Sequence, residues 1–210
     1  MNIVDSLKWR YAVKKFDTER ELTKHQILTL KEAFNLTATS YGLQPLQLLV
    51  IKNKDVQKKL VAHSFNQPQV LEASHLLVIC VPKTYNSKEV EKYFNRVQNT
   101  RNTTDAIIAP FKEFLISEID KKSQEDLFLW NKNQAYIALG NLLTVCAVEK
   151  IDACPMEGFI AEKYDKVLAL KNKNLTSVLV LPVGFRSDDC HMKDMPKVRK
   201  TLSESIIEIN

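Results

Sequence analysis

The longest apolar stretch of the sequence predicts a central helix. Across positions 135–148 only Asn141 and Thr144 interrupt the apolar side chains. A helix that is apolar all round is expected to be buried on all sides. Ser123, followed three positions later by Asp126, predicts a capping box and therefore the start of this helix.

Shorter patterns predict the remaining elements. Apolar runs predict buried strands at 46–51, 75–81 and 175–183. Helical spacing of apolar residues predicts helices at 2–9, 22–36, 54–62, 66–73 and 161–170. No internal repeat or linker divides the chain, so residues 1–210 are expected to form a single domain.

Two segments have a weaker pattern. Residues 85–119 are predicted to be mostly helical but polar, with a loop near 99–104, which is typical of a surface excursion or of a lid. The tail, residues 186–210, is apolar near its end. Positions 205–209 have strand propensity and would need a sheet edge to pair with, and a second subunit offers one.

Two extended segments carry paired cations. In RYAVKKFD the alternation of apolar and polar residues places Arg10, Ala12 and Lys14 on one face. In PKVRK, Lys197 and Arg199 share a face in the same way. This spacing suits an anion, and a solvated basic edge produces the same pattern.

Two loops are candidates for ligand contacts. The segment 37–45 is rich in hydroxyl groups and ends at a proline, so it offers hydrogen bonds to a planar ligand or serves only as a connector. After the short apolar step 151–154, the sequence PMEGF predicts a Pro–Gly turn that presents backbone N–H groups and one carboxylate at the edge of the core. We expect the chemistry at this turn.

Composition excludes several classes of function. Basic and acidic residues are interspersed and the formal net charge is +5, so a nucleic-acid footprint is not indicated. The apolar run of the central helix is shorter than about 18 residues, which argues against a membrane span. The N-terminus lacks the features of a signal peptide, so a cytoplasmic location is expected.

Glycine is scarce, and this constrains how a phosphate can be bound. The chain has four glycines and contains neither a GxGxxG nor a GxxxxGK[ST] motif. Backbone cradles of the Rossmann or P-loop kind are therefore not expected. Arg and Lys side chains must hold any phosphorylated cofactor.

The four cysteines show no CxxC pairing. Cys80 and Cys146 lie in apolar runs and are interpreted as small buried hydrophobic residues. The pair Cys190-His191 suggests metal ligands, but adjacent residues rarely face one ion, so an exposed loop is the expectation. No metal site is predicted.

Five landmarks follow one another along the chain: RYAVKKFD, ATSYGLQP, Asn66 before LEASHLLVIC, the apolar helix ending in PMEGF, and PKVR. With this order and spacing the sequence resembles the FMN-dependent NAD(P)H nitroreductases, in particular the oxygen-insensitive nitroreductase and dihydropteridine reductase branch. The resemblance implies an α+β fold, an α/β/α sandwich with a central mixed sheet flanked by helices. It further implies a homodimer with the buried helix at its interface and the tail wrapped around the partner.

The resemblance also implies site residues. Arg10, Lys197 and Arg199 match the cations that hold the FMN phosphate. Lys14 and Asn66 match groups at the flavin pyrimidine edge. The other residues expected to bind the cofactor are Tyr11, Ala12, Thr39, Ser40, Gly42, Gln69, Gln134, Pro155, Met156, Glu157 and Gly158.

Their roles follow the same resemblance. Backbone N–H groups of Glu157 and Gly158 approach flavin N5 and O4, and the loop with Thr39, Ser40 and Gly42 reaches the flavin of the other subunit. Flavin N5 carries the chemistry, supported by Lys14 and Glu157, so no further catalytic residue is expected.

Three positions depart from the family pattern. Ala12 stands where a Ser or Thr hydroxyl is usual, Gly42 replaces a common asparagine, and Gln69 replaces a common lysine. The loss of positive charge at Gln69 should weaken stabilisation of the reduced flavin.

The implied activity is a ping-pong transfer of hydride from NAD(P)H through FMN to a small electron-poor acceptor, a nitroaromatic or a quinone. The alternatives are a dihydropteridine, enone or free-flavin reductase on the same fold, and a flavin-binding protein without turnover.

Overall fold

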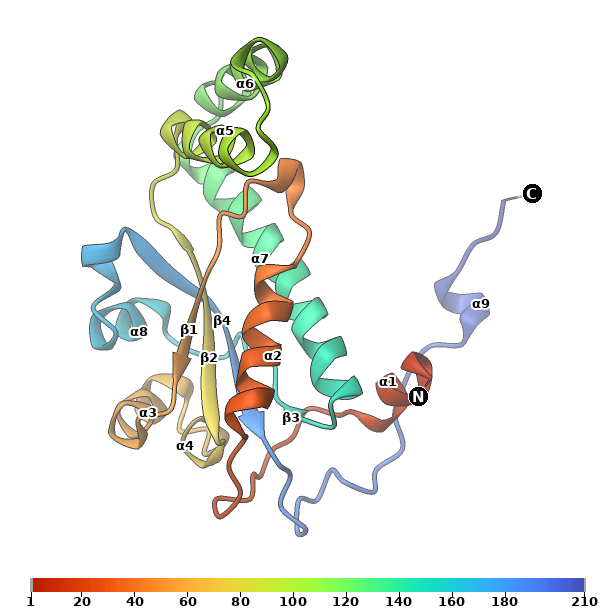
Figure 1. Ribbon diagram of the computed structural model, residues 1–210. Coiled ribbons are helices and arrows are strands. Elements are labelled where there is room, and N and C mark those ends of the chain that lie inside the picture. The colour runs from red at the N-terminus through yellow and green to blue at the C-terminus, as the bar shows by residue number, and fades with distance from the viewer. Residues whose placement is uncertain (1, 210) are drawn as a thin grey trace.

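A four-stranded sheet forms the centre of the computed structural model, which describes residues 2–209. Its strand order is β1-β2-β4-β3, with β1 Gln47–Ile51, β2 His75–Pro82, β4 Leu175–Gly184 and β3 Asp152–Ala153 (Figure 1). The ladders are antiparallel. Among the described residues, parallel pairing is confined to one bridge between Ala12 and Ala153, so the sheet is mixed only at this point.

The two central strands bury both of their faces, as their apolar sequences predict. Because successive side chains of a strand point to opposite faces, β2 divides its residues between two cores. Leu76 and Val78 belong to one core, whereas Leu77 and Ile79 belong to the other. The predicted strands at 46–51, 75–81 and 175–183 are therefore confirmed.

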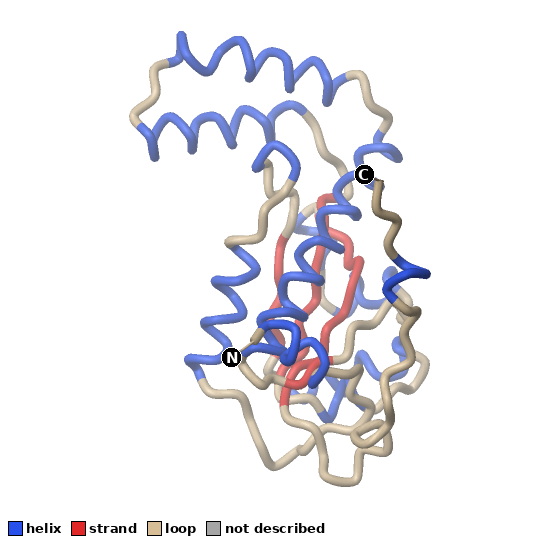
Figure 2. Tube along the Cα trace, turned by 90° about the vertical axis from the view of Figure 1, so that its right-hand side faces the viewer, coloured by secondary structure: helices blue, strands red, loops and turns tan. Residues whose placement is uncertain are grey.

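Helices cover the sheet on both faces, which confirms the α+β sandwich (Figures 1 and 2). On one side α2 (Lys24–Asn35) packs on α7 (Gln124–Val148), which in turn contacts β2 and β4. On the other side lie α3 (Lys54–Val61), α4 (Gln69–Glu72) and α8 (Ala161–Val167). Short 3-10 helices occur at Ser40–Gly42, Ala62–Ser64 and Leu170–Lys173.

The central helix α7 begins where its capping signal predicts. The Ser123 side chain accepts a hydrogen bond from the backbone N–H of Asp126 at 3.1 Å. The expectation that the helix is buried on all sides is wrong for a single subunit. One stripe is exposed and includes Tyr136, Ile137 and Val148, with Ile137 51% exposed.

The segment 85–119 forms two helices, α5 (Ser87–Arg101) and α6 (Asp105–Asp120), which pack on each other. Figures 1 and 2 show the pair projecting beyond one end of the sheet. Its apolar residues form a separate core with the start of α7. The two aromatic side chains of α6, Phe111 and Phe114, remain half-exposed.

The two terminal segments leave many of their apolar side chains exposed. Helix α1 (Ile3–Trp9) contacts α7 and leaves Ile3, Val4 and Leu7 exposed. Residues 196–209 are all exposed, and α9 (Leu202–Ser205) is the helix of this tail. Among the described residues of this subunit, positions 206–209 form neither helix nor strand, so the strand predicted for 205–209 on the sheet edge of a second subunit stays a prediction.

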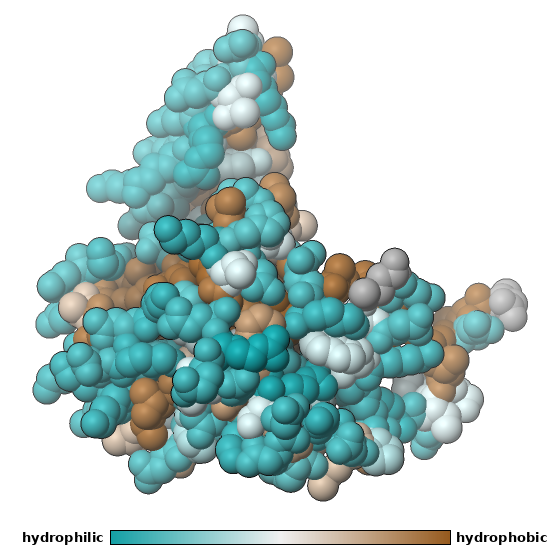
Figure 3. Space-filling view, turned by 60° about the horizontal axis from the view of Figure 1, so that its bottom comes forward, coloured by the Kyte–Doolittle hydropathy of each residue, from teal (hydrophilic) through white to brown (hydrophobic). Residues whose placement is uncertain are grey.

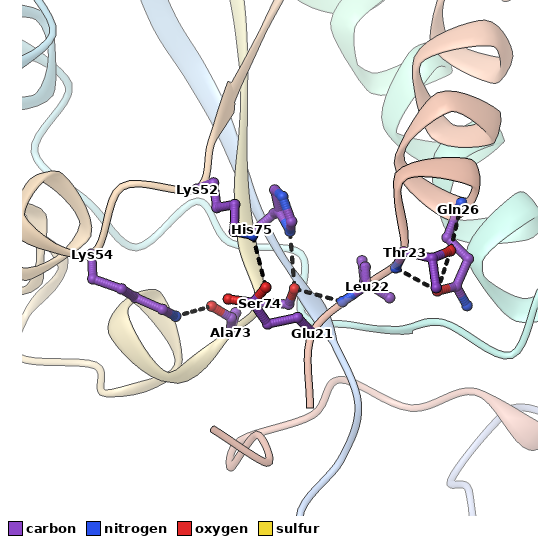
Figure 4. A network of polar contacts seen from close by, with 9 residues as sticks. All are labelled: Glu21, Leu22, Thr23, Gln26, Lys52, Lys54, Ala73, Ser74 and His75. Atoms are coloured by element: carbon purple, nitrogen blue, oxygen red, sulfur yellow. Dashed lines mark hydrogen bonds and ion pairs between the residues drawn. The ribbon is translucent and has the colours of Figure 1, made fainter. Parts of the chain in front are cut away.

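A polar network fixes the segment that leads into α2 (Figure 4). The Ser74 hydroxyl accepts a hydrogen bond from the backbone N–H of Leu22 at 2.8 Å and lies 2.9 Å from Nδ1 of His75. Burial, and then the nearby Lys52, lower the pKa of His75, which favours a neutral ring that accepts from Ser74. Lys52 pairs with Glu21 at 2.7 Å. The segment that precedes α2 is thereby attached to the start of β2.

The four cysteines are free thiols, and all are buried. Cys80 and Cys146 lie in the apolar cores, as predicted. The expected exposure of Cys190 is wrong, because only 3% of this residue is exposed. Within residues 2–209, no helix combines the length and apolar character needed to cross a membrane.

Candidate functional site

Three cations from opposite ends of the chain meet at the end of α1. Arg10 is the C-cap of α1, and the Lys197 ammonium donates a hydrogen bond to its carbonyl oxygen. Burial, and then the charge of Arg199, lower the pKa of Arg10. Burial, and then Arg10 and Arg199, lower the pKa of Lys197. Arg10, Lys197 and Arg199 are called the cation cluster below.

The cation cluster has the charge needed to bind a phosphate. Within the described part of the chain, no carboxylate forms an ion pair with any of its members. The mutual repulsion that lowers the pKa values of Arg10 and Lys197 would be relieved by a dianion. An FMN phosphate fits this donor set, because Arg and Lys side chains can bind it without a glycine-rich loop.

A second group of polar atoms surrounds the thiol of Cys154. The Lys14 ammonium lies 3.7 Å from the sulfur and donates to it. The Gln69 amide donates to the same sulfur at 3.9 Å. Burial raises the pKa of the Cys154 thiol, although Lys14 opposes this shift. Lys14, Cys154 and Gln69 are called the thiol junction below.

The turn Pro155–Gly158 continues from the thiol junction. Met156 pairs with Val180 of β4 through two backbone hydrogen bonds, of 2.8 and 3.1 Å, so the sheet fixes the start of the turn. At its end the carbonyl oxygen of Gly158 accepts a hydrogen bond from the Gln67 amide at 3.1 Å. The Glu157 carboxylate lies beside Tyr136 of α7, at a cavity of about 200 Å³.

Gln67 joins the thiol junction to the turn. Its amide oxygen accepts a hydrogen bond from Gln69 at 2.8 Å while its amide nitrogen donates to Gly158. A Cβ at Gly158 would lie 3.2 Å from this nitrogen, so the glycine permits the close approach. The structure therefore brings Lys14, Gln69 and Gly158 into one connected group.

The loop 37–45, called the hydroxyl loop below, is held at another place. The backbone N–H of Ser40 donates to the buried side chain of Gln134 on α7 at 2.8 Å. Thr39 accepts a hydrogen bond from the backbone N–H of Gln44 at 3.0 Å. Gly42 adopts φ +72°, and a Cβ there would approach the Tyr93 hydroxyl to 2.9 Å. Glycine at position 42 is therefore required by this conformation and this contact.

The structure does not bring all the predicted site residues together. Among residues 2–209, no hydrogen bond joins the hydroxyl loop to the cation cluster or to the thiol junction. In Figure 1 the hydroxyl loop lies at the α5 end of α7, whereas the segment after α1 lies at the opposite end. One subunit therefore presents two separate parts of the predicted site.

Three further predicted residues lie near the part of the site that contains the cation cluster and the thiol junction. Tyr11 carries the Arg186 guanidinium 4.5 Å from its ring centroid, and burial raises the pKa of its hydroxyl. Ala12 forms the parallel bridge to Ala153. Asn66 is exposed and has φ +57°, a conformation that asparagine tolerates better than most residues.

Sequence reasoning missed Cys154 and Gln67 as members of the site. Cys154 directly precedes the PMEGF turn, and this position was the available signal; the residue was interpreted only as part of an apolar step. Gln67 lies two residues before Gln69 in a segment without a regular period, so the sequence offered no signal for it. Within the described residues, no group of three or more His, Cys, Asp or Glu side chains is arranged to hold a metal ion.

The tail that delivers Lys197 and Arg199 projects away from the body. Figure 3 shows a mostly hydrophilic face, with hydrophobic residues gathered in small patches and near the end of the tail at the right. Val198 is 88% exposed and Ile207 is 90% exposed. A tail with this many exposed apolar side chains is unlike the surface of most monomeric proteins.

Comparisons with known proteins identify the family and the fold. The model of the Nitroreductase family matches residues 7–185. A relative from Staphylococcus haemolyticus, named "Putative NAD(P)H nitroreductase SH0546", is 31% identical, and the alignment covers 98% of this chain and 96% of the relative.

Solved structures share the fold. A nitroreductase-type structure of ydfN from Bacillus subtilis has a TM-score of 0.87 at 16% identity, covering 98% of each chain. A structure from Exiguobacterium sibiricum, solved in complex with FMN, has a TM-score of 0.84 at 16% identity and covers 100% of this chain and 98% of its own. With the family match over most of its length, the chain belongs to the nitroreductase family of oxidoreductases.

Proposed function

We propose that this protein is an FMN-dependent oxidoreductase that uses NAD(P)H to reduce nitroaromatic or quinone acceptors. The cation cluster carries this proposal, because it gathers three cations from opposite ends of the chain at the end of one helix, with Lys197 lying 187 residues from Arg10, and no carboxylate among residues 2–209 forms an ion pair with them. When bound, FMN supplies an N5 atom that takes hydride from NAD(P)H and gives it to the acceptor in a ping-pong sequence.

The residues of the chain hold and orient this cofactor. Arg10, Lys197 and Arg199 bind the phosphate. Lys14 and Asn66 face the pyrimidine edge, where a positive charge stabilises the negative charge that develops on reduction. The backbone of the turn Pro155–Gly158 supports the ring, and its pairing with β4 keeps it in place without reorganisation.

The second part of the site comes from another subunit. Under this proposal the chain forms a homodimer, in which the hydroxyl loop of one subunit reaches the flavin held by the other. The exposed apolar stripe of α7, the exposed face of α1 and the apolar tail support this assembly. Burying them against a second copy removes apolar surface from water, and the tail then wraps the partner.

The visible spectrum of the purified protein tests the cofactor first. A flavin spectrum that bleaches on anaerobic addition of NADH or NADPH is the expected result, and it identifies the preferred donor. A protein that remains colourless after incubation with FMN contradicts the proposal. If FMN binds but no donor bleaches it, the protein binds flavin without turnover.

Acceptor profiling then tests the substrate class. The reduced protein is mixed with a nitroaromatic, a quinone, an α,β-unsaturated ketone, a quinonoid dihydropterin and free FMN, and reoxidation is followed in the visible range. We expect the nitroaromatic and the quinone to reoxidise it fastest. Faster reoxidation by the ketone, the pterin or free FMN would assign one of the alternative reductase activities.

A further inference from the structure

Two donors from distant parts of the chain converge on one buried sulfur atom. Lys14 comes from the segment after α1, and Gln69 begins α4, yet both donate to the sulfur of Cys154, at 3.7 and 3.9 Å. Cys154 has no exposed surface. A buried acceptor shared by two donors restricts the positions of both side chains.

From this convergence we propose that Cys154 is a positioning residue: its thiol fixes the Lys14 ammonium and the Gln69 amide at the pyrimidine edge of the flavin. The inference rests on the proposed function, because it concerns the bound cofactor. Under this proposal, the thiol influences how strongly the protein stabilises reduced FMN relative to oxidised FMN.

The character of the thiol explains why it suits this task. Burial raises the pKa of Cys154, so the sulfur is an uncharged thiol near pH 7. A carboxylate at this position would orient Lys14 equally well but would neutralise its charge. A neutral sulfur orients the ammonium and leaves its full positive charge for the flavin. Arg10 is the other charge that acts on this thiol, and it is also positive.

Gln69 makes the positioning of Lys14 more important. Its side chain is buried and carries no charge, and its amide is already engaged by Gln67 and Cys154. In the thiol junction Lys14 is therefore the one charged member. If its ammonium is displaced, the positive electrostatic potential at the pyrimidine edge of the flavin changes, because the thiol junction contains no second cation that could compensate.

The experiment compares Cys154→Val, which removes the acceptor, with Cys154→Ser, which keeps one. The midpoint potential of bound FMN and the dissociation constants of oxidised and reduced FMN are measured for the purified full-length proteins. A hydrogen bond contributes about 0.5–1.5 kcal/mol. For Cys154→Val we expect binding of reduced FMN to weaken about 3- to 10-fold more than binding of oxidised FMN, and Cys154→Ser to recover most of this change.

In potential, this ratio corresponds to a decrease of roughly 15–30 mV for a two-electron couple. Cys80→Val is the matched control, because Cys80 is equally buried but accepts from no side chain. It should leave the potential unchanged. If valine does not fit at position 154, Cys154→Ala removes the acceptor without adding volume.

A double-mutant cycle with Lys14→Met shows whether the thiol acts through the ammonium. In the Lys14→Met background, Cys154→Val should change the potential little. Equal potentials in wild type and Cys154→Val would overturn the inference, and so would an undiminished effect of Cys154→Val on the potential in the Lys14→Met background. In either case, reduction of the bound flavin by NAD(P)H would leave the proposed function intact. A wild-type protein that binds no FMN would overturn both.

Discussion

The turn Pro155–Gly158 and the hydroxyl loop both belong to the proposed site, yet the fold holds them in different ways. The turn pairs with β4 through backbone hydrogen bonds between Met156 and Val180. The hydroxyl loop is attached to α7 through two hydrogen bonds that involve side chains, from Ser40 to Gln134 and from Asn141 to Thr37, and it contains residues with positive φ at Tyr41, Gly42 and Gln44.

This difference shows which part of the site a single subunit can build. The turn, the thiol junction and the cation cluster form a connected region whose position depends on the sheet. The hydroxyl loop depends on local turns, on the side chains of Gln134 and Asn141, and on burial of Leu43, and it lies at the other end of α7. We infer that the first region holds the cofactor and that the second completes the site of a partner.

The largest expected effect comes from disrupting the proposed homodimer. Ile137→Asp places a carboxylate in the exposed apolar stripe of α7. An unpaired buried charge costs about 3 kcal/mol or more, on the order of 100-fold in the dimer dissociation constant. Light scattering after gel filtration should show a monomer with weaker FMN binding. Lys58→Asp, on α3 at the opposite face of the sheet, is the control and should remain dimeric.

The next largest effect is expected from a substitution that removes one member of the cation cluster and leaves the hydroxyl loop unchanged. Hydrogen bonds to charged groups contribute about 1.5–3 kcal/mol, so Arg199→Ala should weaken FMN binding about 10- to 100-fold. Fluorescence titration with FMN measures this change. Lys200→Ala alters an adjacent exposed cation and should change binding less than twofold. Equal losses for the two variants would mean that general charge, rather than the cluster, holds the phosphate.

Gln134→Leu tests the hydroxyl loop alone. The backbone N–H of Ser40, which is partly buried, would lose its acceptor, and the loss of a hydrogen bond costs about 0.5–1.5 kcal/mol. The free energy of unfolding should fall by this amount in urea denaturation. Asn133→Ala, at an exposed neighbouring position, should have little effect. An unchanged stability for Gln134→Leu would show that the loop is held by other contacts.

The smallest effect concerns Cys80, in the core of the sheet, and appears only at alkaline pH. Burial, and then Asp165, raise the pKa of Cys80 to about 12 from a usual value of 9.0. Above pH 9 the unfolded thiol loses its proton while the folded thiol keeps it, so stability decreases as pH rises from 9 towards 12. At pH 10 the loss should be about 1.4 kcal/mol, and Cys80→Val should remove that share of the slope.

Sequence patterns predicted the framework of this protein well because the forces that form it are local in sequence. The two-residue period of strands and the N-cap at Ser123 depend on neighbours along the chain. The same reasoning failed for Cys190, because burial of the thiol depends on the fold around it. A strand at 205–209 needs the edge of a sheet, which a second subunit would have to offer, so it stays a prediction.

The sequence by itself therefore determined the helices and strands and the family resemblance. Its scarcity of glycine also assigned phosphate binding to Arg and Lys side chains. The tertiary structure alone decided that Lys197 contacts Arg10 and that Lys14 and Gln69 share the sulfur of Cys154. It also decided that one stripe of α7 stays exposed. The physical reason is that contacts between residues far apart in the chain depend on how the elements pack, which no local pattern of apolar and polar residues encodes.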